Sequence, residues 1–127
     1  MPYEVEVSDE FRHWYEPLSE AEQLSVERVV LMLAEAGPAL SFPYSSGIQQ
    51  SKFSHMRELR IQHEGRPYRV LYAFDPVRAA FLILGGDKTG DDRWYDTMVP
   101  KADAIYTKHL KTLQEEQKRA SKKKRPR

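Results

Sequence analysis

The sequence has no cysteine among its 127 residues. Its absence excludes a disulfide framework, as well as zinc or iron–sulfur sites built on cysteine ligands. No apolar run approaches the ~18 residues of a membrane span. The first residues lack the apolar core of a signal peptide, and no internal repeat is visible. These absences predict a cytoplasmic location without membrane association.

What is present favours a folded domain. Apolar residues make up 40% of the chain, and two Trp, seven Tyr and five Phe are among them. A chain of this length can bury one real core. We therefore expect a single domain over residues 1–116, followed by a basic, disordered tail over residues 117–127.

The net charge of +1 conceals a strong asymmetry along the chain. Residues 1–36 carry a net charge of −7, and residues 52–88 carry +3. Residues 117–127 hold seven basic residues and no acid. An anion would therefore be bound by a local basic patch rather than by overall charge. The tail itself has three interpretations: a solvated end, an unspecific contact to ribosomal RNA or DNA, or a contact to a protein partner.

Local signals predict a small α+β domain. Residues 3–7 alternate like a strand, Ser8 caps a short helix that stops near Pro17, and Ser19 opens a helix with a capping box. That helix stops at Gly37, and residues 38–54 are expected to form a loop. The remaining elements are a hairpin over residues 56–74, a strand over 79–84, and a last helix from Pro100. The prediction is an antiparallel sheet made of an N-terminal strand and a three-strand meander. Two N-terminal helices pack on it, and a helix follows it.

The hairpin places arginines opposite each other. With Glu64-Gly65 as a two-residue turn, Arg60 faces Arg69 across the strand pair. Like charges in this position cost stability, unless an acid lies between them or an anion binds there. Glu58 is close enough to be that acid. Solvent-facing arginines that only aid solubility are the other interpretation.

The next strand extends this arrangement. Continuing the meander puts Leu82 and Leu84 on the Arg60/Arg69 side of the sheet, with Lys88 just past the strand end on the same side. Two guanidiniums and an ammonium would then converge, and guanidinium binds phosphate through paired hydrogen bonds. Asp87 is expected to orient Lys88 or to cap its loop.

Histidines give no strong signal of a general base. His63 lies in the hairpin turn, where solvent exposure is expected. His109 shares a helical spacing with Ile105 and Leu113, so a structural role is expected.

Four segments carry a resemblance to a known family: Arg57-Glu58-Leu59-Arg60, Tyr68-Arg69-Val70-Leu71-Tyr72, Leu84-Gly85-Gly86-Asp87-Lys88-Thr89-Gly90, and the helix with Pro100, Ala102, Asp103, Tyr106, His109 and Leu110. In this order they resemble the phage-derived, HigB-like branch of the RelE/ParE toxin superfamily. The resemblance covers nearly the whole chain apart from the tail. It implies the RelE-like fold and a toxin of a type II toxin–antitoxin pair. It also implies an antitoxin partner, usually a helix-turn-helix DNA-binding protein.

The resemblance further implies cleavage of messenger RNA on the ribosome, without a metal or other cofactor. The ribose 2′-hydroxyl attacks the adjacent phosphate, which needs a base, cations and an acid. Arg60 and Arg69 match the family's phosphate-stabilising arginines, and Lys88 matches a loop lysine that binds phosphate or carries a proton. Tyr95 lies where relatives place an aromatic or proton-transfer group. Expected RNA contacts are Lys52, His55, Arg57, Arg66 and Trp94.

Two other functions stay open at this point. A ParE-like toxin would poison DNA gyrase by binding, without cleaving RNA. A degenerate phage or operon protein would keep the fold without activity. The cluster of Arg60, Arg69 and Lys88 favours the nuclease, while the missing general base favours the alternatives.

Overall fold

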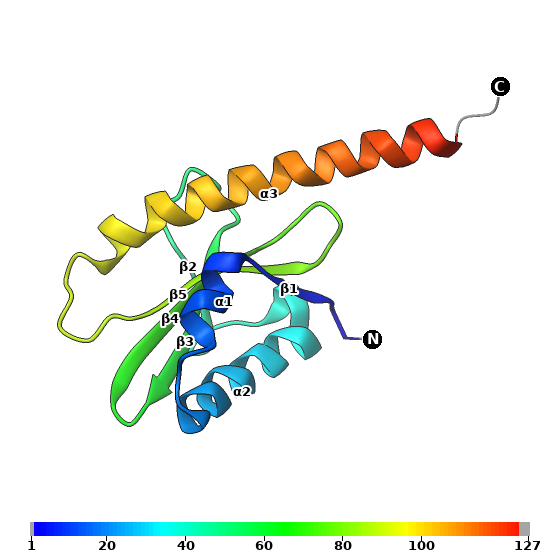
Figure 1. Ribbon diagram of the computed structural model, residues 1–127. Helices are drawn as coiled ribbons and strands as arrows, with labels where there is room; N and C mark the ends of the chain where they lie inside the picture. Colours follow the sequence, from blue (N-terminus) through cyan, green and yellow to red (C-terminus); the bar gives the residue numbers. More distant parts are fainter. Residues whose placement is uncertain (1, 125–127) are drawn as a thin grey trace.

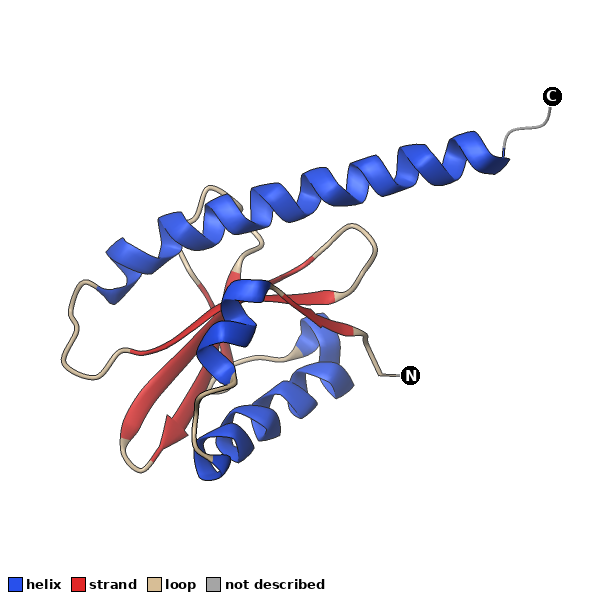
Figure 2. Ribbon diagram, in the orientation of Figure 1, coloured by secondary structure: helices blue, strands red, loops and turns tan. Residues whose placement is uncertain are grey.

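The computed structural model describes residues 2–124. Its elements follow one another around a single sheet (Figures 1 and 2). In chain order they are β1 (Val5–Val7), α1 (Asp9–Tyr15), α2 (Glu20–Ala36), the 3-10 turn η1 (Gly37–Ala39), β2 (Ser45–Gly47), β3 (Arg57–His63), β4 (Arg66–Phe74), β5 (Ala80–Asp87) and α3 (Trp94–Lys124). The α+β architecture predicted from the sequence is confirmed.

Both N-terminal helices begin at the predicted caps. The Ser8 hydroxyl accepts a hydrogen bond from the Phe11 amide at 2.9 Å, and it donates to the Ile83 carbonyl at 2.5 Å. Ser19 and Glu22 form a complete capping box at the start of α2. Ser8 thus caps α1 and also fixes that helix to β5.

The sheet has the order β1-β5-β4-β3-β2. Its centre is the predicted antiparallel meander, but β1 runs parallel to β5, so the sheet is mixed rather than antiparallel. The segment expected to be a loop contains β2, which pairs antiparallel with residues 57–59. Ser-Ser-Gly has no apolar alternation, so its strand pairing is not visible in the sequence.

The register of the hairpin is as predicted, with Arg60 opposite Arg69. The next pairing is not, because the register shifts between Leu71 and Tyr72. Leu84 pairs with Leu71 on the arginine side, whereas Leu82 pairs with Tyr72 and faces the opposite side. The prediction that both leucines share one face was wrong, since a bulge adds one residue and reverses the alternation.

Two hydrophobic cores lie on the two faces of the sheet. Helices α1 and α2 cover one face, where Leu33, Leu59 and Val70 are buried. Helix α3 covers the other face, where Leu71, Ile83 and Tyr106 are among the buried residues. The sequence assigned only the first face to a core. The arginine side is therefore partly covered rather than open to solvent.

Helix α3 differs from its prediction at both ends. It begins at Trp94, and Pro100 lies inside it, so the proline did not mark the first turn. It continues to Lys124, whereas the sequence predicted a disordered tail from residue 117. Residues 125–127 lie outside the described part. The end of the helix projects beyond the sheet (Figure 1). Over residues 2–124, no helix is long and apolar enough to cross a membrane.

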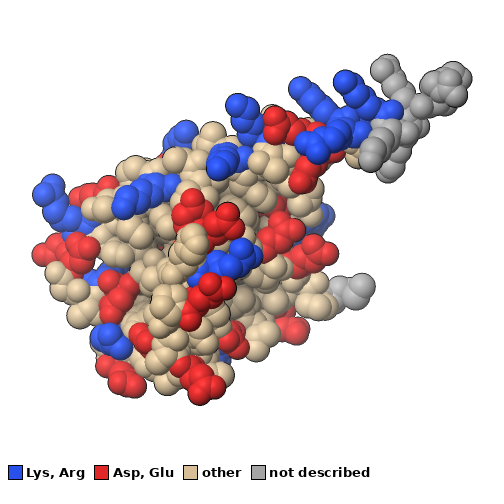
Figure 3. Space-filling model, viewed as in Figure 1, with Lys and Arg blue, Asp and Glu red and all other residues tan. Residues whose placement is uncertain are grey.

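Charge is distributed unevenly over this shape. Lys and Arg side chains gather on the projecting end of α3, while acidic side chains are spread over the body below it (Figure 3). Lys118, Arg119 and Lys122 belong to the projecting end and are exposed.

Candidate functional site

A carboxylate lies at the centre of the arginine side. Glu58 on β3 is only 4% exposed. Its Oε2 accepts hydrogen bonds from the Ser46 hydroxyl at 2.7 Å and from Arg60 Nη1 at 3.1 Å. Its Oε1 accepts one from the Tyr95 hydroxyl at 2.5 Å and lies 3.6 Å from Arg69 Nε. The acid expected between the two arginines is therefore present, and it connects β2, β3, β4 and α3.

Arg69 lies beneath this carboxylate and is 4% exposed. Its Nη1 donates to the Tyr68 carbonyl at 3.0 Å. Its Nε has no hydrogen-bond acceptor, and among the described residues it is the only buried side-chain nitrogen or oxygen in this state. A buried donor without a partner costs free energy. The interpretation of Arg69 as a solvent-facing arginine was wrong, because α3 covers this side.

Tyr95 enters the site from the start of α3. Burial, and then its hydrogen bond to Glu58, raise the pKa of the Tyr95 hydroxyl above its ordinary value of 10.0. The hydroxyl therefore keeps its proton at neutral pH. Lys88 lies above this ring, with Nζ 5.6 Å from the ring centroid. Arg60, Arg69, Lys88 and Tyr95 are thus brought together around Glu58.

Trp94 positions this tyrosine instead of binding a ligand. It is 4% exposed, and its ring packs against Gly86, where a Cβ atom would lie 2.6 Å from the Trp94 Nε1. The Trp94 and Tyr95 rings meet edge to face at 5.2 Å. Burial on this scale leaves no ring face for a base, so the expected RNA contact of Trp94 does not agree with the structure.

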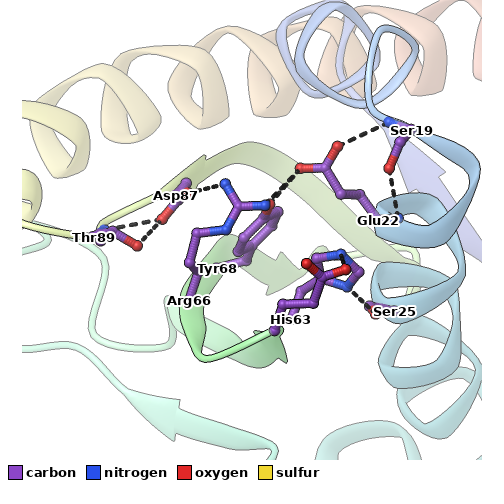
Figure 4. A network of polar contacts seen from close by, with 9 residues as sticks. Ser19, Glu22, Ser25, His63, Arg66, Tyr68, Asp87 and Thr89 are labelled. Carbon is purple, nitrogen blue, oxygen red and sulfur yellow. Dashed lines mark hydrogen bonds and ion pairs between the residues drawn. The ribbon is translucent and has the colours of Figure 1, made fainter.

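Arg66 belongs to a neighbouring network that joins α2 to the hairpin (Figure 4). It pairs with Asp87 at 3.3 Å and with Glu22 at 3.7 Å. The Tyr68 hydroxyl donates to Glu22. This contact, followed by the cap at Ser19, lowers the pKa of Glu22 to about 2, and burial raises the pKa of Tyr68 to about 12. Two carboxylates already offset the charge of Arg66, which weakens the case for an RNA contact.

The remaining predicted RNA contacts lie elsewhere. Arg57 is on the opposite face from Glu58 and Arg60, because side chains alternate along a strand, and its Nε donates to Ser45 at 3.0 Å. The Lys52 amide donates to Asp103, and His55 Nε2 lies 2.9 Å from the Tyr106 hydroxyl. Asp103 is about 12 Å further along α3 than Tyr95, at 1.5 Å per helical residue.

The Asp75 carboxylate contacts the two other helices' neighbours at the far end of β5. Its Oδ1 accepts the amides of Val77 and Ala79, and its Oδ2 lies 2.8 Å from His109 Nε2. His109 also stacks on Phe81 at 3.7 Å, as expected of a structural histidine. With Glu6 they form the one group that could hold a metal ion within residues 2–124, but Asp75 already has its hydrogen bonds.

Two details of the histidine and loop predictions are also decided. His63 is 8% exposed and bonds Ser25 on α2 at 2.7 Å, so the expectation of an exposed turn residue was wrong. Asp87 caps its loop by accepting from the amide and hydroxyl of Thr89, as predicted.

The arrangement combines three chemical abilities. Glu58 can accept a proton, Tyr95 can donate one, and the cations of Arg60, Arg69 and Lys88 lie next to both. Acid–base catalysis on a phosphodiester needs this combination. Sequence reasoning treated Glu58 only as a neutralising acid and missed Ser46. The alternation that puts residues 58 and 60 on one face was the available signal for Glu58.

Comparison with known proteins agrees with the resemblance seen in the sequence. The family described as phage derived protein Gp49-like (DUF891) matches residues 13–107. The proposed toxin HigB3 of Mycobacterium tuberculosis (strain ATCC 25618 / H37Rv) is 42% identical over 91 residues, which cover 71% of this chain and 78% of that protein. The proposed toxin HigB2 of the same organism is 32% identical over 114 residues, covering 88% of this chain and 57% of that protein.

A solved structure shares the fold. The E. coli toxin RelE, as a free double arginine-to-alanine mutant, superposes with a TM-score of 0.54 and 12% identity, covering 77% of this chain and 96% of that chain. At this identity the likeness shows the fold alone. The fold is thus RelE-like. The chain belongs to the phage-derived Gp49-like family and is a HigB-like toxin.

Proposed function

We propose that this toxin is an endoribonuclease that cleaves messenger RNA on the ribosome, with Glu58 as the general base. The observation that carries this proposal is the hydrogen bond between Tyr95 and Glu58, at 2.5 Å, inside a group of three cations. A base and an acid in contact, next to cations, match the needs of phosphodiester cleavage by an internal hydroxyl.

In the proposed reaction, Glu58 takes the proton of the ribose 2′-hydroxyl. The 2′-oxygen forms a bond to the adjacent phosphorus, and the bond from phosphorus to the 5′-oxygen breaks. Tyr95 gives its proton to that leaving oxygen. The products are a 2′,3′-cyclic phosphate and a 5′-hydroxyl, and the two residues end with their protons exchanged.

The cations have different tasks in this proposal. The side chain of Arg60 is 30% exposed, and Lys88 is half-buried at the mouth of the site, so these two can reach the phosphate oxygens. Arg69 is buried against Glu58 and holds the carboxylate in place. Its charge also favours the negative charge that develops on phosphate.

A cognate antitoxin is the expected partner, because the relatives are toxins of this kind. A helix-turn-helix DNA-binding antitoxin is the proposal for its nature, together with the ribosome and messenger RNA as targets. The ParE-like alternative is not favoured, since both relatives carry HigB names and the fold neighbour is RelE.

The test is induced expression in bacteria of the wild type, Glu58→Gln and Glu64→Gln, with mapping of messenger RNA 5′ ends. Glutamine keeps the shape of Glu58 but cannot take the proton, so new 5′ ends inside reading frames should fall by about 100-fold or more. Glu64 lies in the exposed hairpin turn, so Glu64→Gln should cleave like the wild type.

Two outcomes would contradict the proposal. Growth arrest with intact messages in the wild type would exclude cleavage and point to a toxin that acts by binding. Undiminished cleavage by a folded Glu58→Gln variant would remove Glu58 from the role of base. Circular dichroism of both variants checks that they fold.

A further inference from the structure

A groove opens at the edge of β3, next to the Glu58 site. Strand β2 pairs only with residues 57–59, so the edge of β3 is uncovered from Arg60 onward. The groove lies between this edge, α2 and the segment before β2, and its volume is about 390 Å³. That volume is within the range of about 300–1,000 Å³ that is usual for small-ligand sites.

Two aromatic rings stand exposed beside this groove. Phe42 is 69% exposed and Tyr44 is 42% exposed. Tyr44 lines the groove, and the Arg60 guanidinium lies over the Phe42 ring at 5.1 Å from its centroid. The carbonyl of Tyr44 accepts the Arg60 amide at 2.8 Å, which fixes this segment to the strand. Rings held at the mouth of a polar groove are suited to stacking.

The groove is lined by three arginines. Arg28 of α2 is exposed, and over residues 2–124 it forms no ion pair. Arg60 shares its charge with Glu58, and Arg69 contributes the buried Nε that has no acceptor. The lining therefore offers donors for an anion next to aromatic faces. A protein segment would not need this pairing of guanidiniums with stacking rings, whereas a nucleotide does.

We propose that this groove binds one nucleotide of single-stranded RNA, next to the bond that is cut. Its base stacks on Phe42 and Tyr44, and its phosphate is held by Arg28 and Arg60. The inference rests on the proposed function, and it assigns part of substrate binding to residues that take no part in the chemistry. Arg60 joins the two sites, since it contacts both Glu58 and Phe42.

The experiment measures binding rather than cleavage. The probe is a short single strand of 2′-O-methyl RNA, which has no attacking hydroxyl, together with a strand of equal length without bases. Both are titrated into the wild type, Phe42→Ala/Tyr44→Ala and Leu31→Ala. Leu31 is an exposed apolar residue of α2 at 66% exposure that does not line the groove, so its variant controls for lost apolar surface.

The wild type should bind the strand with bases about 10-fold or more tightly than the strand without them. The double variant should lose this preference and Leu31→Ala should keep it, while both variants unfold at the wild-type temperature. Full preference in the double variant would overturn the proposal, and so would equal binding of both strands by the wild type. Unchanged RNA binding with lost capture of the antitoxin would mark the rings as a protein interface and overturn it as well.

The two proposals can fail separately. If messages stay intact in cells while base-dependent binding is lost in the double variant, the cleavage proposal fails and the groove still binds RNA. If messages are cut but the double variant binds like the wild type, the groove assignment fails and the cleavage proposal stands.

Discussion

Glu58 shows how one residue resolves the conflict in the hairpin. Arg60 and Arg69 face each other directly, which is unfavourable on its own. The carboxylate lies between them, and Ser46 and Tyr95 complete its hydrogen bonds. Removing the carboxylate would leave Arg69 buried beside no acid, and a buried charge without its partner costs several kcal/mol. For this reason Glu58→Gln, rather than truncation to alanine, is the informative change.

Glu22 gives a prediction of pH dependence at the residue scale. Its pKa is lowered from 4.5 to about 2 in the folded protein, first by the hydrogen bond from Tyr68. A lowered carboxylate pKa stabilises the fold above the unfolded pKa, and this stabilisation is lost as pH falls from about 4.5 toward 2. The wild type should therefore lose unfolding temperature more steeply over this range than Glu22→Gln does.

Glutamine preserves the capping box at this position, so the comparison isolates the charge. Glu20→Gln, an exposed change in the same helical turn, is the matched control and should follow the wild type. Parallel pH profiles for wild type and Glu22→Gln would show that the contact between Tyr68 and Glu22 does not favour the ionised form.

At the scale of elements, the start of α3 determines where Tyr95 lies. The Trp94 ring fills the space above Gly86, where any side chain would collide with it. Gly86 also pairs with Arg69 in the sheet. The glycine therefore lets α3 approach the strand closely enough for Tyr95 to reach Glu58.

Gly86→Ala should consequently destabilise the protein by about 1–3 kcal/mol, as expected of overpacking in a core. It should also reduce cleavage, because the displaced Trp94 carries Tyr95 with it. Urea unfolding and a cleavage assay measure the two effects. Gly47→Ala is the control, since a Cβ there lies at an ordinary 3.6 Å from Arg57 Nη1. Wild-type stability in Gly86→Ala would show that the ring of Trp94 is not fixed against the strand.

At the scale of the whole molecule, charge is divided between the body and the end of α3. Residues 117–127 carry seven basic residues and no acid, and the rest of the chain has 13 basic and 19 acidic residues. The described part of this end is helical and exposed. Exposed residues without packing partners add little to stability, so the end is free to act as an electrostatic contact.

Removing residues 117–127 should therefore weaken binding to ribosomes, and it should flatten the dependence of the affinity on salt by roughly 0.7–0.9 per lost phosphate contact. The free energy of unfolding should change by less than about 0.5 kcal/mol. Sedimentation with ribosomes at two salt concentrations measures the binding. A full-length variant with Lys118, Arg119 and Lys122 changed to Gln separates charge from length. An unchanged salt dependence in both would show that this end only solvates the helix.

The sequence by itself determined the features that depend on near neighbours. Helix caps at Ser8 and Ser19, the two-residue turn and the pairing of Arg60 with Arg69 follow from local hydrogen bonding and strand alternation. The family resemblance also followed from short segments in order, and it is confirmed.

Tertiary structure alone decided the features that depend on distant contacts. The bulge that separates Leu82 from Leu84, the parallel pairing of β1, the burial of Arg69 under α3 and the exposure of Phe42 beside Arg60 each result from packing between elements far apart in the chain. Packing selects among pairings that are locally equivalent, because buried surface gained across the whole fold outweighs local preference. No local pattern records that choice, so the base at Glu58 became visible only when four elements met around it.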